Sequence, residues 1–345
     1  MVDAVPLPVH VLTGFLGSGK TTLLARLLRQ PSFSDTAVVI NELGEVGLDH
    51  LLVDRGSEDD VVLLDSGCLC CALGNSLQET LESLYYRRAR RELPAFARVV
   101  VETTGVADPG PIAATLGLDS AIARHYRLGS IVTVVDAVYG GEQLQRFEEA
   151  RRQVALADRL IVTKSDLTDN ATIARLDAIL ATRNPHAERI TAIAGDVSAA
   201  TVIADVLEAQ TMRPYASASD AAARAHLDAT HPRDSGSAIH AHDHLAAQGI
   251  VSTTIQLAAP LDWPRYADWV QWAQRAMGDG LLRMKGVVRM ADGDIKALHA
   301  VMRMFSAPCA LPSLPATLGD GVIVLVTQNL PATVLDEARL RLGGL

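Results

Sequence analysis

The segment Gly14–Thr21 carries residue types that bind phosphate. It reads Gly-Phe-Leu-Gly-Ser-Gly-Lys-Thr directly after an apolar run, which matches the strand, G-x-x-x-x-G-K-[ST], helix arrangement. Glycines let the backbone wrap closely around phosphate oxygens, and the start of the following helix presents amide groups to them. We expect Lys20 to reach the β- and γ-phosphates and Thr21 to offer a hydroxyl to Mg²⁺. The predicted nucleotide contacts are Gly17, Ser18, Gly19, Lys20, Thr21 and Thr22.

Two further segments supply what a nucleotide site needs beside phosphate. The apolar run Arg98–Val101 ends in Glu102, which we expect to hold a Mg²⁺ water or to orient the attacking water. The run Leu160–Val162 leads into Thr163-Lys164-Ser165-Asp166, where Asp166 can accept hydrogen bonds from the N1 and N2 groups of guanine. Lys164 and Asp166 therefore indicate a preference for guanine, which Thr163, in place of the usual asparagine, weakens.

Three thiols lie within four residues, at Cys68, Cys70 and Cys71. Thiolates bind soft or borderline metal ions, and three of them leave a fourth position open for another ligand or for handing the ion on. Two alternatives remain: buried apolar cysteines, and a redox switch. Zn²⁺, Co²⁺, Fe²⁺ and Ni²⁺ all suit such a site.

The elements that must position these residues follow an α/β pattern. Short β-branched runs alternate with amphipathic helical stretches, which predicts a mostly parallel sheet with helices on both faces. The expected strands are Val9–Leu12, Ala37–Ile40, Val61–Leu64, Val99–Val101, Ile131–Val135, Leu160–Val162 and Ile190–Ile193. The expected helices include Thr21–Arg29, Ser76–Arg91, Pro111–Ala114 and Ala171–Thr182.

The pattern changes twice after this region. Residues 212–249 are rich in Ala, Ser, Asp and His and lack an apolar period, which predicts a flexible linker. Beyond it the chain favours a smaller α+β domain, ferredoxin-like in our interpretation. Its expected strands are Ile250–Leu257, Leu281–Met290, Ile295–Met304 and Val322–Thr327, and its expected helices are Trp263–Met277 and Ala332–Leu342. The predicted domains are therefore 1–211 and 250–345.

Composition narrows the class of protein. The chain has 345 residues, 49% of them hydrophobic, and a formal net charge of −9, which argues against general affinity for nucleic acid. Four cysteines are too few for a disulfide framework. No basic and apolar leader is present at the start, and no run reaches about 18 apolar residues. We therefore expect a cytoplasmic protein that does not bind a membrane.

Taken in order, these motifs resemble the CobW-type P-loop GTPases. The resemblance is carried by the phosphate loop, the run Asn41–Gly47, the Gly67-Cys68-Leu69-Cys70-Cys71 motif, the Glu102–Gly105 loop and Thr163–Asp166, with Arg283–Gly286 in the second half. The family includes proteins implicated in metal delivery. It implies that Asn41–Gly47 is a switch segment near the γ-phosphate, with Glu42 in the metal environment.

The resemblance implies a metallochaperone, in which binding and slow hydrolysis of GTP to GDP drive capture of a transition metal, Zn²⁺ or Co²⁺ first, and its delivery to a client metalloprotein. The histidines of the linker, His226, His231, His240, His242 and His244, could collect a metal weakly or serve only as a polar linker. The competing hypotheses are a redox-regulated NTPase without metal delivery and a metal-binding or insertion scaffold that uses nucleotide only to fold.

Overall fold

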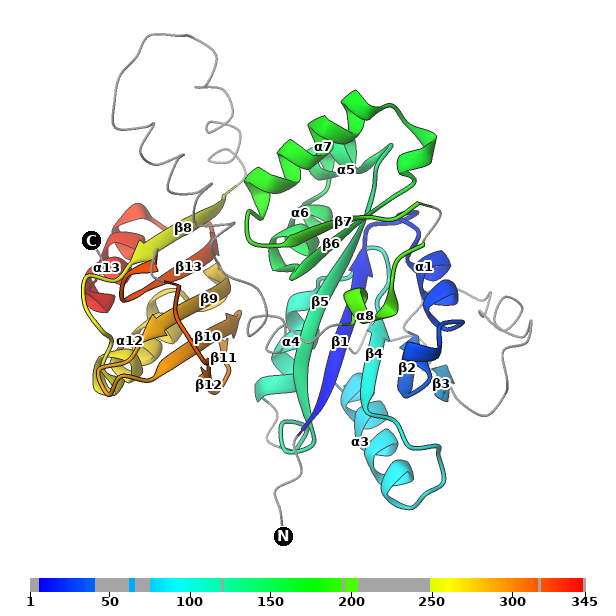
Figure 1. Ribbon diagram of the computed structural model, residues 1–345, viewed down its shortest axis with the longest axis horizontal. Helices are drawn as coiled ribbons and strands as arrows, with labels where there is room; N and C mark the ends of the chain where they lie inside the picture. Colours follow the sequence, from blue (N-terminus) through cyan, green and yellow to red (C-terminus); the bar gives the residue numbers. More distant parts are fainter. Residues whose placement is uncertain are drawn as a thin grey trace. The chain divides into compact units, whose positions relative to one another are not determined.

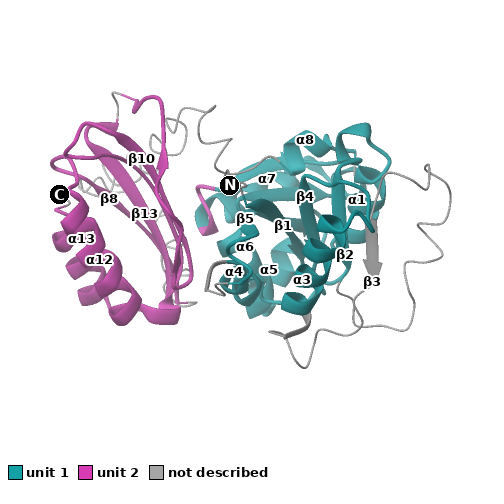
Figure 2. Ribbon diagram, turned by 90° about the horizontal axis from the view of Figure 1, so that it is seen from below, with its two compact units in different colours: residues 1–182, 187–206 teal, residues 183–186, 207–345 magenta. Residues whose placement is uncertain are grey.

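The computed structural model describes residues 6–40, 62–65, 75–118, 121–193, 196–203, 249–315 and 318–343. The chain divides into two compact units (Figure 2). Unit 1 comprises Met1–Thr182 and Ala187–Val206, and unit 2 comprises Arg183–His186 and Leu207–Leu345. None of the helices in the described ranges has both the length and the apolar content that crossing a bilayer requires.

Unit 1 is built on a sheet whose seven described strands are all parallel, in the order β3-β2-β4-β1-β5-β6-β7. The strands are β1 (Leu7–Gly14), β2 (Thr36–Ile40), β3 (Val62–Asp65), β4 (Arg98–Glu102), β5 (Tyr126–Asp136), β6 (Arg159–Thr163) and β7 (Glu188–Thr191). Parallel strands place all their carboxyl ends at one edge of the sheet, where α/β proteins bind ligands. The predicted parallel sheet is confirmed.

Helices cover both faces of this sheet (Figure 1). They are α1 (Lys20–Leu27), α3 (Asn75–Ala89), α4 (Pro109–Leu118), α5 (Gly140–Arg146), α6 (Glu148–Leu156), α7 (Asn170–Arg183) and the short α8 (Ala199–Val202). Val134 and Val135 are neighbours on β5 but belong to different core clusters, one shared with α1 and the other with α5, α6 and α7. This alternation is what a strand covered on both faces requires.

Helices α5 and α6 have no counterpart among the helices named from the sequence. Each is short, with 7 and 9 residues, and Phe147 between them is extended, with φ −115° and ψ 127°. A break in the helical period at Phe147 leaves neither half long enough for a clear apolar repeat. Both helices contact the phosphate loop.

The imidazole of His10 is buried between β1 and β5, 2% exposed, where a hydrogen bond of 2.7 Å joins its Nδ1 to the hydroxyl of Ser130. Burial lowers the pKa of His10 to about 3, and the charges of Arg98, Arg159 and Arg127 act in the same direction. The unfolded chain takes up this proton near its ordinary pKa of 6.5. Burial of neutral His10 therefore leaves the free energy of unfolding unaffected above pH 6.5, and lowers it as the pH falls from 6.5 toward 3.

A His10→Leu variant should reveal this linkage. Between pH 7 and pH 5, the free energy of unfolding of the native chain should fall by about 2 kcal/mol more than that of the variant. Denaturant titration of both proteins at each pH measures the difference. His186, whose pKa burial also lowers, to about 4, is present in both proteins and cancels. Equal pH slopes would contradict the assignment to His10.

Unit 2 is an α+β unit with an antiparallel sheet in the order β11-β10-β9-β13-β8, with β12 beside β10. The strands are β8 (Ile250–Gln256), β9 (Leu281–Arg289), β10 (Ile295–Val301), β11 (Met304–Phe305), β12 (Cys309–Ala310) and β13 (Gly321–Gln328). Two helices, α12 (Trp263–Ala276) and α13 (Ala332–Leu342), lie together on one face of this sheet (Figure 2).

The topology of unit 2 differs from the ferredoxin-like expectation. The segment β8-α12-β9 is a split β-α-β unit, because β8 and β9 both pair antiparallel with β13 between them. In a ferredoxin-like fold the second helix precedes the last strand, whereas α13 follows β13 here. The expected strand Ile295–Met304 is also interrupted, since Met302 has φ +53° and starts the turn into β11. The α+β class itself is confirmed.

Candidate nucleotide-binding site

The phosphate loop joins β1 to α1 at the carboxyl edge of the sheet. Gly14 has φ +145°, and a Cβ there would lie 2.3 Å from the carbonyl oxygen of Val134 on β5. Gly17 and Gly19 also have positive φ, +73° and +96°. These conformations, which L side chains rarely adopt, let the chain reverse direction tightly between strand and helix. Lys20, only 9% exposed, donates from Nζ to the carbonyl of Gly14 at 2.8 Å.

Two observations fit this loop to a phosphate group. The hydroxyl of Ser18 is fully buried and has no hydrogen-bond partner within the described ranges. A Cβ placed on Gly17 would meet no atom within 4 Å, so the space beside this glycine is open. A buried hydroxyl without a partner is destabilising unless a ligand satisfies it. Phosphate oxygens would do so, and the loop therefore fits the group that its sequence predicts.

Glu102 lies beside the start of α1, as the sequence predicts. Its carboxylate is 0% exposed at the end of β4, and Thr21 donates its hydroxyl to Oε1 of Glu102 at 3.2 Å. Register places Glu102 opposite both Leu12 of β1 and Ile40 of β2. A hydroxyl and a carboxylate in contact are hard oxygen ligands of the type that Mg²⁺ prefers. Thr21 and Glu102 thus fit a magnesium ion next to the phosphate loop.

The loop after β6 is bonded directly to the phosphate loop. The hydroxyl of Thr163 lies 2.6 Å from the carbonyl oxygen of Ser18 and donates to it. Lys164, in the left-handed region with φ +56°, donates from Nζ to the carbonyl of Gly17 at 2.6 Å. Thr163 therefore ties the two loops together, even though it stands where asparagine was expected. Asp166 follows in a short 3₁₀ turn, Ser165–Leu167, with its side chain exposed.

Asp136 belongs to this site and is absent from the sequence-based site residues. It ends β5 opposite Thr163, is 1% exposed, and its Oδ2 accepts a hydrogen bond from Lys164 Nζ at 2.7 Å. Its Oδ1 accepts from the backbone amides of Val138 and Tyr139 at 2.7 and 3.2 Å. A signal was available, because Asp136 follows a buried β-branched strand just as Glu102 does.

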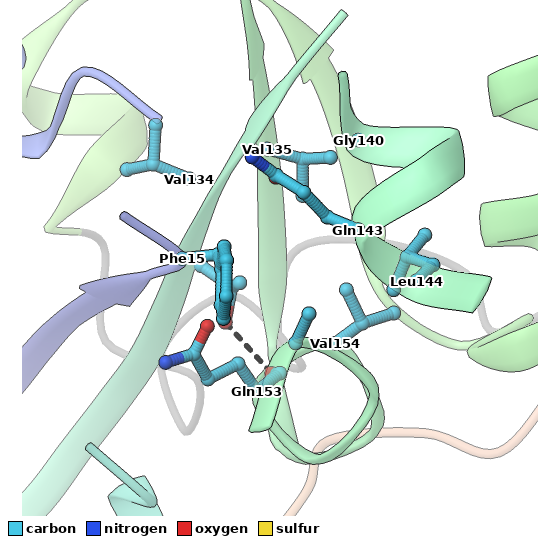
Figure 3. A pocket seen from close by; sticks show the side chains of 10 residues that line it. Phe15, Val134, Val135, Gly140, Gln143, Leu144, Gln153 and Val154 are labelled. Atoms are coloured by element: carbon cyan, nitrogen blue, oxygen red, sulfur yellow. Dashed lines mark hydrogen bonds between the residues drawn. The ribbon is translucent and has the colours of Figure 1, made fainter. Parts of the chain in front are cut away.

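A small apolar cavity lies behind the phosphate loop, between β5 and the helices α5 and α6 (Figure 3). Phe15 points into it and stacks on Phe147, with ring centroids 4.6 Å apart. The remaining lining residues are Thr133, Val134, Val135, Gly140, Gln143, Leu144, Ala150, Gln153 and Val154. The cavity fixes the base of the loop by packing, and its apolar lining makes it unsuitable for a charged nucleotide.

The predicted transition-metal ligands Glu42, Cys68, Cys70 and Cys71 lie outside the described residues, as do the five histidines assigned to the linker. Within the described residues, no group of three His, Cys, Asp or Glu side chains is placed to hold a metal ion. The strands β2 and β3, which precede Glu42 and the cysteine motif in the sequence, are neighbours in the sheet, and Ile40 pairs with Asp65 at their ends. Both strands end at the edge that carries the phosphate loop.

Comparison with known proteins identifies relatives of both halves. The profile of the family described as CobW/HypB/UreG, nucleotide-binding domain, matches residues 8–191. The profile of the cobalamin synthesis protein CobW C-terminal domain matches residues 250–340. The crystal structure of Zn(II)-bound YjiA GTPase from Escherichia coli superimposes with a TM-score of 0.67 at 27% identity, and the match covers 98% of each chain.

Curated relatives match about half of the chain. The zinc chaperone YjiA of Escherichia coli (strain K12) is 39% identical over 193 residues, 56% of this chain and 59% of the relative. The zinc-regulated GTPase metalloprotein activator 1 of Schizosaccharomyces pombe is 39% identical over 168 residues, 47% of this chain and 40% of the relative. The matched region thus spans less than two thirds of either relative. With its phosphate loop, its parallel sheet and both family matches, the chain belongs to the CobW/HypB/UreG family of P-loop proteins and carries a CobW C-terminal domain.

Proposed function

We propose that this protein is a GTP hydrolase that couples nucleotide binding and hydrolysis to the capture and delivery of a transition metal, zinc or cobalt, to a client metalloprotein. The observation that carries the nucleotide half is the direct bonding between loops: Thr163 and Lys164 contact the phosphate loop at Ser18 and Gly17. A guanine held by Asp166 and phosphates held by Gly17–Thr22 would then occupy one continuous site.

In this proposal each side chain has a separate task in phosphoryl transfer. Lys20 stabilises the negative charge that develops on the β- and γ-phosphates, because its ammonium group is already oriented by Gly14. Thr21 and Glu102 would hold Mg²⁺, which would neutralise phosphate charge. Glu102 also orients the attacking water. The sequence motifs around the phosphate loop include no catalytic glutamine or arginine finger, so we expect slow intrinsic turnover.

The metal half rests on the cysteine motif and on the relatives. Cys68, Cys70 and Cys71 follow β3, which ends at the same edge as the phosphate loop, and Glu42 follows β2 at that edge. Two of the relatives are named for zinc, as a zinc chaperone and as a zinc-regulated GTPase. We infer that γ-phosphate contacts change the segments after β2 and β4, and that the thiolate site, which lies between these segments in the sequence, changes its metal affinity accordingly.

Coupling of this kind predicts that metal affinity depends on the nucleotide. In anaerobic titrations, the dissociation constant for Zn²⁺ should differ by about fivefold or more between the protein with a non-hydrolysable GTP analogue and the protein with GDP. The reciprocal change, by the same factor, should be measured in the affinity for the GTP analogue when Zn²⁺ is present.

Cysteine variants provide the control for this titration. Replacing Cys68, Cys70 and Cys71 by serine should abolish the nucleotide-dependent metal binding, whereas Cys309→Ser, which removes the cysteine of β12 in unit 2, should preserve it. Equal Zn²⁺ affinity in all nucleotide states would refute the coupling. A response of GTP turnover to thiol oxidation, without any response to Zn²⁺ or Co²⁺, would favour the redox-regulated NTPase instead.

In this proposal the chain has three parts, and the nucleotide site and the cysteine motif both belong to the first. Residues 1–211 form the GTPase domain, residues 212–249 form a histidine-containing linker, and residues 250–345 form the CobW-type domain. The family matches to residues 8–191 and 250–340 support this division, and the zinc and GTPase functions named for the relatives support the proposed activities.

A further inference from the structure

Helix α6 contacts the loop that follows β4 through two neighbouring side chains. The amide nitrogen Nε2 of Gln153 donates to the carbonyl oxygens of Gly105 at 3.2 Å and Ala107 at 2.9 Å. Next to it, Nε of Arg152 forms an ion pair with Oδ2 of Asp108 at 3.1 Å. The loop 103–108 is therefore held from one side by a helix that lies between 44 and 48 positions further along the sequence.

The environment of Gln153 shows that its polar group is used and is not merely tolerated. The side chain is 0% exposed, and because both facing atoms are carbonyl oxygens, the donor end of the amide must point toward the loop. Its Oε1 is buried and has no hydrogen-bond partner in the described part of the chain. An unsatisfied buried oxygen is destabilising, so packing alone would favour an apolar side chain of similar length. The contact with the loop gives glutamine a reason to be there.

The opposite side of the same loop rests on the phosphate loop. A Cβ on Gly105 would lie 2.6 Å from Cδ2 and 2.8 Å from Cα of Leu16, so the two backbones are in close contact. Phe15, the residue before Leu16, packs on Phe147 at the start of α6. The loop 103–108 is thus enclosed between the phosphate loop and α6, and α6 contacts both.

Holding these carbonyls has a defined effect on the backbone. In a trans peptide the C=O and N–H groups point in opposite directions. Fixing the carbonyls of Gly105 and Ala107 toward α6 therefore turns the N–H groups of Val106 and Asp108 away from α6. Oriented backbone N–H groups at fixed positions are the donors with which proteins stabilise phosphate oxygens at low reorganisation cost.

We propose that Gln153 is a positioning residue, which holds residues 103–108 against the phosphate loop in the conformation that receives the terminal phosphate of a nucleoside triphosphate. This role rests on the proposed function, because it assumes that the loop after Glu102 senses the γ-phosphate. Arg152 supports the same conformation through Asp108. Gln153 itself contacts neither nucleotide nor metal, and acts only through the loop.

The test compares triphosphate and diphosphate binding in Gln153→Met, which keeps the length of the side chain and removes the donor. The dissociation constant for a non-hydrolysable GTP analogue should rise about tenfold, while that for GDP should change less than about twofold. Single-turnover hydrolysis at saturating GTP should slow about tenfold. Gln153→Glu, which places a carboxylate against two carbonyl oxygens, should raise the ratio of the dissociation constant for the GTP analogue to that for GDP further. Gln145→Met, at an exposed glutamine of α5, is the matched control and should change none of these values.

Each outcome decides the role of Gln153. Equal weakening of GDP and of the GTP analogue would make Gln153 a purely structural residue, and unchanged values in Gln153→Met would exclude any role. If Gln153→Met does not fold, Arg152→Met keeps the test valid, because both partners of its ion pair are about a quarter exposed. It should shift the ratio by about two- to threefold in the same direction. If the native protein binds no guanine nucleotide, the proposed function fails first, and the same ratio measured with adenine nucleotides still tests Gln153.

Discussion

Replacing Lys20 by alanine should lower the rate of GTP hydrolysis by about a hundredfold or more, the usual effect of removing one preorganised group that stabilises the transition state. Lys20 is 9% exposed and its ammonium group is fixed by the carbonyl of Gly14, so the charge sits in the phosphate loop before substrate arrives. A phosphate-release assay at saturating GTP measures the effect, and nucleotide titration separates lost binding from lost turnover.

The control for this prediction is Lys296→Ala. Lys296 lies on β10 in unit 2 and pairs with Asp294, so its removal takes away one lysine without touching unit 1. Its hydrolysis rate should equal that of the native chain. If Lys20→Ala folds with an unchanged melting temperature and still hydrolyses GTP at the native rate, then phosphoryl transfer does not take place in this loop, and the proposed enzymatic function would have to be abandoned.

Asp166→Asn should exchange the preferred base. The carboxylate can accept two hydrogen bonds from guanine N1 and N2, whereas asparagine keeps one acceptor and turns the other into an NH2 donor that faces a guanine N–H, which weakens GTP binding by about a hundredfold. Xanthine presents an oxygen where guanine has its N2 amino group, so the amide of the variant should bind xanthosine triphosphate more tightly than the native carboxylate does. Competition titrations with GTP and xanthosine triphosphate measure both changes.

Asp169→Asn is the matched control for this exchange. Asp169 lies three positions further on. Its carboxylate accepts a hydrogen bond from the backbone amide of Thr172 at the start of α7, and asparagine can accept the same bond. Its nucleotide preference should remain that of the native chain. Unaltered GTP affinity in Asp166→Asn would show that the exposed carboxylate does not read the base and that selection between guanine and adenine resides elsewhere.

The sequence predicted those site residues that lie within one local segment or at the end of a strand. The phosphate loop is contiguous, so its glycines, Lys20 and Thr21 can be recognised from the sequence without knowledge of the tertiary structure. Glu102 was found because a buried strand ends there. Asp136 has the same local signature but acquires its role only from Lys164, 28 positions away, and Gln153 from a loop 46 to 48 positions away. Such partners depend on how strands and helices are ordered, which no local pattern contains.

The same limit applies to the fold: elements formed by one continuous stretch of sequence were predictable, and the order in which they pack was not. Parallel strands and the long helices follow from apolar periodicity, because each is a property of one continuous stretch. The short helices α5 and α6, broken at Phe147, and the two-residue strands β11 and β12 have too few residues to show a period. The position of α13 after β13 instead of before it is a property of chain order within unit 2, which depends on packing across the sheet.

The bonds from Thr163 to Ser18 and from Lys164 to Gly17 have a consequence for how a nucleotide is held. In the proposed site, the base and the phosphates would be the two arms of a bivalent ligand, and the two loops that bind them would be joined by these bonds. Once one arm is bound, the other meets its receptor at a high effective concentration. Guanosine alone and inorganic pyrophosphate alone would therefore each bind weakly. The sum of their two binding free energies would be smaller in magnitude than the binding free energy of GDP.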